Sequence, residues 1–99
     1  MLYAIIAEDA PATQDLRRQT RPAHLARLAT LRDQGRLVLA GPHPSLDAED
    51  PGSAGFTGSL IVAEFPALAD AQAWVATDPY HEAGVYSRVV VKPFLKVLP

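Results

Sequence analysis

LYAIIA, residues 2–7, is a short apolar run in which both the odd and the even positions are hydrophobic. Its β-branched and aromatic members, and the acidic residues that follow, are typical of a buried strand. Successive side chains of a strand point to opposite faces, so Tyr3 and Ile5 lie on one face and Leu2 and Ile6 on the other. Neither face of a sheet that contains this strand is therefore suited to water.

Outward from this run, turn-forming residues separate three more strands and two helices. The helical region from Thr13 to Gln34 contains Pro22, which lacks an amide hydrogen, so we expect a bend near Thr20-Arg21 and a restart with Pro22 in the first turn. Gly35 is the natural end of this region. The remaining predicted elements are a strand at 36–40, a strand at 59–65, a helix that opens at Pro66 and a strand at 85–94.

The order strand, helix, strand, strand, helix, strand predicts one α+β domain over residues 1–99, with the ferredoxin-like βαββαβ arrangement. Its four-stranded antiparallel sheet carries both helices on one face, because crossover connections are right-handed. The other face is also apolar, as the alternation of Leu60 and Val62 with Ile61 and Ala63 indicates. We therefore expect a homodimer in which two copies pack through their open sheet faces.

Two further features concern the ends of strands. Residues 43–55 combine prolines, glycines and acidic residues without any period, so they form a loop that is either a lid or a simple mobile surface loop. Pro93 cannot donate to a neighbouring strand, which predicts that the end of the last strand lies at an edge or a bulge.

Composition excludes several classes of protein. The chain has 99 residues, a formal charge of −2, no cysteine and nine scattered basic residues, so no face is suited to nucleic acid. Disulfides, thiolate nucleophiles and Cys-type zinc sites are excluded. No apolar run approaches the roughly 18 residues of a membrane span, and the acidic start does not resemble a signal peptide. We expect a cytoplasmic protein that binds neither nucleic acid nor membrane.

His24 is the first residue of chemical interest, within RPAHLARL at residues 21–28. At about 100° per residue, His24, Leu28 and Leu31 fall within about 60° of one another, so the imidazole faces inward with the leucines. It is either a core histidine with a satisfied partner or a residue that borders a cavity.

Asp78 is the second, within TDPYHEAGVY at residues 77–86. Asp78 before Pro79 is typical of a helix start, in which the carboxylate accepts free backbone amides. The segment also lies at an end of the sheet, from which it can approach His24. A carboxylate beside an imidazole fixes the ring's tautomer and orientation, and such a pair is suited to proton transfer. Both interpretations stay open from the sequence alone.

Other candidate residues bind rather than react. Arg21 either holds an anionic group or is a solvated surface arginine. The further candidates for substrate binding are Gly41, Pro42, Tyr80 and Tyr86, and each tyrosine either lines a pocket or serves packing. The three histidines match no metal-ligand spacing, so neither a metal nor a cofactor is expected. No serine-hydrolase motif or phosphate loop is present.

The chain resembles the YciI-like family from end to end, in MLYAII, RPAHLARL, GRLVLAGP, DPGSAGFTGSLIVAEF and AQAWVATDPYHEAGVYSRVVVKPF. The resemblance implies a ferredoxin-like subunit that pairs into a dimeric α+β barrel. It also implies an active site around the histidine of PAH and the aspartate of DPY, which are His24 and Asp78. The family is similar in architecture to barrels that transform small cyclic organic molecules without a bound metal or flavin.

Three functions follow from these observations. The first is an enzyme of isomerase, lyase or hydrolase type, in which His24 is a general acid or base and Asp78 orients it in an apolar pocket. The second is a non-catalytic dimeric module that binds a small metabolite. The third is a purely structural domain in which His24 is satisfied by the backbone and Asp78 is only a helix cap.

Overall fold

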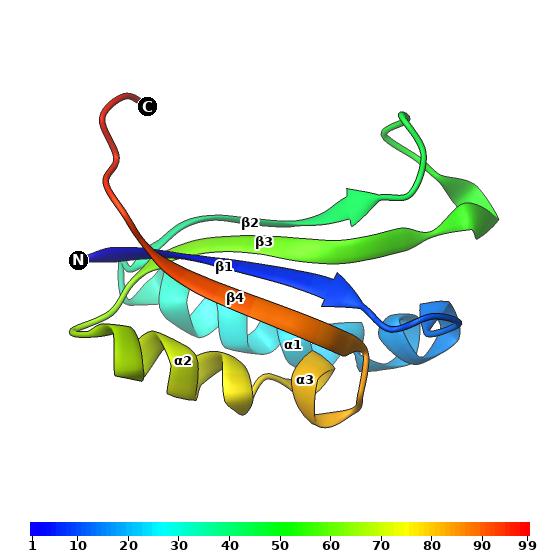
Figure 1. The fold of residues 1–99 in the computed structure, drawn as a ribbon, viewed down its shortest axis with the longest axis horizontal. Coiled ribbons are helices and arrows are strands. Elements are labelled where there is room, and N and C mark those ends of the chain that lie inside the picture. Colours follow the sequence, from blue (N-terminus) through cyan, green and yellow to red (C-terminus); the bar gives the residue numbers. More distant parts are fainter.

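The computed structural model describes residues 1–99 and consists of one sheet with a layer of helices beneath it (Figure 1). The strands are β1 (Leu2–Asp9), β2 (Leu37–Pro44), β3 (Phe56–Glu64) and β4 (Tyr86–Phe94). The helices are α1 (Gln14–Asp33), α2 (Leu68–Ala76) and the short α3 (Pro79–Glu82), with a 3₁₀ turn, η1, at Gly52–Ala54. No helix is long and apolar enough to span a bilayer.

The sheet has the strand order β2-β3-β1-β4, and every neighbouring pair is antiparallel. The helices all lie on the same side of it, as Figure 1 shows. This order places the first and third strands in the centre, as two right-handed crossovers require. The predicted α+β, ferredoxin-like βαββαβ fold is therefore confirmed.

The core lies between the sheet and the helices. Tyr3, Ile5 and Ala7 of β1 point into it and are at most 5% exposed. Their buried helical partners are Leu28 and Leu31 from α1 and Ala71 and Val75 from α2. The odd-numbered residues of β1 thus form the face that the helices cover.

The even positions of β1 lie on the face that no helix covers. Ile6 is 38% exposed there and pairs with Leu60 on one side and Val90 on the other. Leu39 of β2, which pairs with Val62, is 47% exposed. The strands therefore present a continuous apolar surface, which we call the open sheet face, and homodimerisation through it stays a prediction.

The predicted interruption of the first helix and its restart at Pro22 are wrong. α1 runs without interruption from Gln14 to Asp33, with Pro22 inside it. Pro22 is exposed, so water can satisfy the carbonyl of Arg18 that loses its helical donor. Burial of His24 and the leucines that follow it on the same face keeps the helix in one piece.

Several predicted boundaries also shift. β2 and β3 extend to Pro44 and Phe56, beyond the predicted ranges, because they pair with each other at those positions. α2 begins at Leu68 rather than at Pro66. Two expectations are confirmed: Gly35 follows α1 with a φ of 72°, and Pro93 lies in β4, an edge strand.

We expect the protein to sediment as a dimer at micromolar concentration and Ile6→Lys to convert it to a monomer, because the lysine would be buried without a partner between the two sheets. Leu39→Lys, at the sheet's edge strand, tests the same face if Ile6→Lys does not fold by circular dichroism. Ala26→Lys, on the exposed side of α1, is the control. A monomeric wild type, or dimers that persist in both open-face variants, would contradict the prediction.

Candidate active site

His24 and Asp78 meet in the folded chain although 54 positions separate them. The Nδ1 atom of His24 lies 2.9 Å from Oδ1 and 3.0 Å from Oδ2 of Asp78. His24 is 5% exposed and Asp78 is fully buried. The inward face of α1 brings the imidazole to the start of α3, where the carboxylate lies.

Asp78 also caps the N-terminus of α3. Its Oδ1 accepts a hydrogen bond of 2.9 Å from the backbone N–H of Tyr80, and Pro79 takes the first helical position of α3. The helix-cap interpretation and the histidine-partner interpretation are therefore compatible, since one carboxylate serves both. Capping fixes the carboxylate, and the fixed carboxylate in turn fixes the imidazole.

Arg27 balances the buried carboxylate from the other side. Its guanidinium lies 3.8 Å from Oδ2 of Asp78 and donates a hydrogen bond of 2.9 Å to the Trp74 carbonyl. It also packs over the Trp74 ring, 4.4 Å from the centroid. A buried carboxylate needs such partners, because an unpaired charge is costly to remove from water. Sequence reasoning did not single out Arg27.

The second ring nitrogen of His24 is open to a cavity. Nε2 makes no hydrogen bond within the chain, and His24 lines a cavity of about 460 Å³ between α1 and the β2–β3 half of the sheet. When the carboxylate accepts the Nδ1 proton, the neutral ring carries its lone pair on Nε2. His24 therefore borders a cavity rather than completing the core.

Four of the five predicted binding residues line this cavity with His24: Arg21, Gly41, Pro42 and Tyr80. Tyr86 does not line it. The Tyr86 ring packs edge-on against Tyr80, 5.6 Å between centroids, and its buried hydroxyl has no hydrogen-bond partner. The structure thus gives Tyr86 a place behind the cavity wall.

Tyr80 supports the imidazole directly. The rings of His24 and Tyr80 stack with centroids 4.1 Å apart and an interplanar angle of 22°. The same Tyr80 ring receives the guanidinium of Arg17, 4.6 Å from its centroid. Burial raises the pKa of Tyr80 above its usual range, so the phenol stays neutral at physiological pH.

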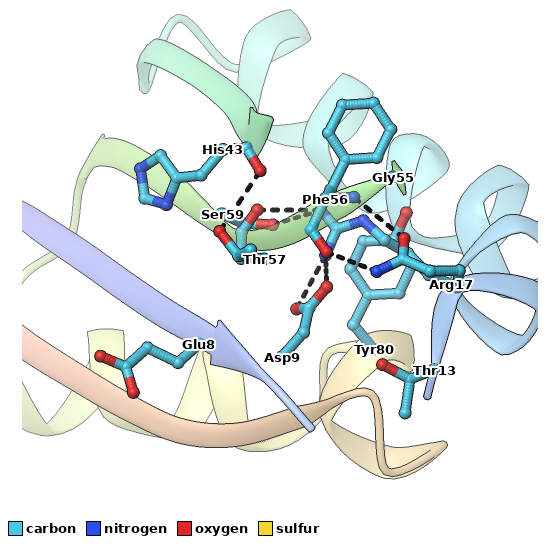
Figure 2. Close-up of polar contacts among 12 residues, drawn as sticks. Glu8, Asp9, Thr13, Arg17, His43, Gly55, Phe56, Thr57, Ser59 and Tyr80 are labelled. Carbon is cyan, nitrogen blue, oxygen red and sulfur yellow. Dashed lines mark hydrogen bonds and ion pairs between the residues drawn. The ribbon is translucent and has the colours of Figure 1, made fainter. Parts of the chain in front are cut away.

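Arg17, which also lines the cavity, is the centre of a buried polar cluster (Figure 2). Its Nη1 donates to both carboxylate oxygens of Asp9, at 2.8 and 2.7 Å. Its Nη2 donates to Ser59 Oγ at 2.7 Å and to the Gly58 carbonyl at 3.3 Å. Burial raises the pKa of Asp9 in spite of this arginine. The sequence offered no signal for the cluster, since an arginine on a helix is usually exposed.

The loop before β3 forms one wall of the cavity. Gly52, Ser53 and Gly55 line it. The side-chain amide of Gln14 binds the backbone N–H and carbonyl of Phe56 at 2.9 and 2.6 Å, much as a neighbouring strand would. A Cβ on Gly55, whose φ is 69°, would overlap the Gln14 side chain. The end of the loop is therefore anchored to α1, and movement of the rest stays a prediction.

Comparisons with known proteins cover almost the whole chain. Residues 1–95 match the profile of the YCII-related domain. The chain is 58% identical to Protein YciI of Escherichia coli O6:H1 over 97 residues, which is 98% of this chain and 99% of the relative. It is 53% identical, with the same coverage, to a protein of Haemophilus influenzae.

A solved structure with the same fold is 5-chloro-2-hydroxyhydroquinone dehydrochlorinase (TftG) from Burkholderia phenoliruptrix AC1100, in complex with 2,5-dihydroxybenzoquinone. It superposes with a TM-score of 0.85 at 25% sequence identity, over 96% of this chain and 94% of that one. The subunit of this protein and that of TftG thus share the same α+β fold.

Arg17→Met is expected to lower the free energy of unfolding by about 3–5 kcal/mol, because it leaves the Asp9 carboxylate buried without its partner. Urea denaturation measures the loss. The double variant with Asp9→Asn should recover part of it, since no buried charge then remains unpaired. Arg32→Met breaks an ion pair that is about 70% exposed and should cost less than about 1 kcal/mol. Equal losses for Arg17→Met and Arg32→Met would refute a structural role for the cluster.

Tyr86→Phe is expected to raise the pH at which the protein unfolds in alkali. Burial raises the pKa of Tyr86 in the folded state well above the value of about 10 in an unfolded chain. Unfolding is therefore coupled to loss of the phenolic proton, and stability falls as the pH rises above about 10. Removing the phenol removes this contribution. Circular dichroism between pH 9 and pH 12 would detect the shift, and an unchanged midpoint would contradict it.

Proposed function

This chain belongs to the YCII-related, YciI-like family, and we propose that it is an enzyme that moves a proton on a small, partly apolar organic molecule. One observation carries the proposal: the imidazole of His24 is fixed at Nδ1 by a buried carboxylate and is open at Nε2 to a cavity. A core histidine would bury both nitrogens or satisfy them within the chain.

In the proposed reaction, Nε2 of His24 takes a proton from the substrate and Asp78 stabilises the resulting imidazolium through Nδ1–H. The electron pair left on the substrate forms a new double bond. In an elimination the leaving group departs as an anion from the neighbouring atom, and in an isomerisation His24 returns the proton to a different atom. Asp78 acts on the substrate only through the ring, so it is a positioning residue.

Elimination from a hydroxylated ring is the form of this reaction that we favour. The structural neighbour TftG is named for a dehydrochlorination, a reaction that removes H⁺ and Cl⁻ from one molecule. The cavity offers a planar ring several apolar contacts, from residues that include Leu25, Leu28 and Phe56. Arg21, Gly41, Pro42 and Tyr80 are the proposed substrate-binding residues that line it.

The alternative is a dimeric module that binds a small metabolite without turnover. A cavity lined by fixed side chains supports binding as well as it supports catalysis. The two functions differ in what they require of His24, because only catalysis needs Nε2 to gain and lose a proton.

His24→Gln is expected to lower the rate of chloride release from 5-chloro-2-hydroxyhydroquinone by about 10²- to 10⁴-fold, the usual contribution of a general acid or base. A glutamine side chain cannot act as a general base, and its size is close enough to that of histidine to keep the cavity similar. His81→Gln, at an exposed position of α3 outside the cavity lining, is the matched control.

A second variant tests the role of Asp78 in the same assay. Asp78→Asn keeps an oxygen for the Tyr80 amide but removes the charge that stabilises the imidazolium, so the maximal rate falls and its pH profile changes. Chloride release that is unaffected by His24→Gln would exclude the proton-transfer mechanism. Binding of 2,5-dihydroxybenzoquinone by the wild type without any turnover would favour the binding module.

A further inference from the structure

The charges around the cavity are all of one sign. Its charged lining residues are Arg17, Arg18 and Arg21, and the lining contains no aspartate or glutamate. Low-dielectric walls with charges of one sign concentrate the potential inside a cleft. Whether each arginine is paired with a carboxylate therefore decides how much positive charge a bound molecule meets.

Two of these arginines are already paired. Arg17 is neutralised by Asp9 at 2.7 Å. Arg18 pairs with Asp15 at 2.9 Å, where both side chains are at least 75% exposed, so the pair contributes little to binding. Neither charge is fully available to a guest.

Arg21 has no partner in the chain. It makes no hydrogen bond and no ion pair, whereas the chain's six other arginines each make at least one: Arg17, Arg18, Arg27, Arg32, Arg36 and Arg88. Arg21 lines the cavity together with Tyr80. Burial raises the pKa of Tyr80, and the positive charges of Arg17 and, to a smaller extent, Arg21 oppose that rise. A single unpaired guanidinium thus lies at the wall that also holds His24.

Arg21 and His24 lie close together along α1. They are three residues apart on α1, which is about 4.5 Å along the helix axis and on neighbouring positions of one face. Because both residues also line the cavity, one guest can contact both side chains. Guanidinium binds carboxylates and ionised phenols with charge-assisted hydrogen bonds.

We propose that the molecule bound in this cavity is an anion, a ring compound with a carboxylate or an ionised hydroxyl that Arg21 holds while the reacting atom faces Nε2 of His24. The proposal rests on the proposed function for the role of His24, but the charge preference stands on Arg21 alone.

Calorimetric titration with two matched probes tests the charge preference. The first is 2,5-dihydroxybenzoquinone, which is ionised at neutral pH, and the second is 2,5-dimethoxybenzoquinone, which has the same ring and no ionisable hydroxyl. The wild type is expected to bind the first at least tenfold more tightly. Raising the salt concentration should narrow the gap, because the bound charge is near the surface.

Three variants assign the preference to Arg21. Arg21→Gln should abolish the difference between the probes, Arg21→Lys should retain most of it, and Arg32→Gln, which lies outside the lining, should leave it unchanged. Benzoate and benzamide, followed by the NMR shifts of the His24 ring protons, form a second pair in case neither quinone binds. A wild type that prefers the anion in neither pair, or an Arg21→Gln variant that keeps the preference, overturns the proposal.

The outcomes for charge and for catalysis are separable. His24→Gln should keep the preference for the anionic probe, since the imidazole does not supply it. If the preference survives while His24→Gln has normal turnover, the proton-transfer function fails and the anion site remains. If turnover depends on His24 and both probes bind equally, the function remains and the anion proposal fails.

Discussion

The buried carboxylate of Asp78 is the constraint on which the site depends. It caps α3 through the Tyr80 amide, holds Nδ1 of His24 on α1 and lies 3.8 Å from Arg27. Such a carboxylate is tolerated only because all of these groups converge on it. The mutual position of α1 and α3 and the direction of the imidazole are therefore set by the same oxygens, so the chemistry of the site cannot be altered there without altering the packing.

A second buried polar group, Arg17, supports the site through Tyr80. Arg17 joins β1, β3 and α1 through Asp9, Ser59 and the Gly58 carbonyl, and its guanidinium lies over the ring of Tyr80. Tyr80 in turn stacks on His24. The imidazole is thus held at one nitrogen by a hydrogen bond and at its face by a ring. The cavity beside this ring is therefore organised before any guest arrives.

The apolar alternation of LYAIIA links this site to assembly. Its odd-numbered residues belong to the core, and its even-numbered residues form part of the open sheet face. The two faces of β1 therefore have different roles: one packs against the helices, and the other belongs to the proposed dimer interface. The cavity lies on the helix side of the sheet, so the proposed dimer would cover the opposite face.

Local patterns in the chain were sufficient for the fold and for the inward direction of His24. Hydrophobic period, the proline and glycine positions and the order of elements are properties of neighbouring residues, and they predicted the ferredoxin-like arrangement and the end of α1 at Gly35. The same local rule misjudged Pro22, because it could not weigh one lost hydrogen bond against the burial of a whole helix face.

What only the tertiary structure decided are the contacts between distant segments. The sequence allowed Asp78 to be a cap or a partner, and folding made it both. The pairing of Arg17 with Asp9, the approach of Arg27 and the place of Tyr86 behind the wall had no signal in the sequence. Charges reveal their burial and their partners only when strands and helices far apart in the chain are packed together, since the cost of desolvation depends on surroundings that no local pattern records.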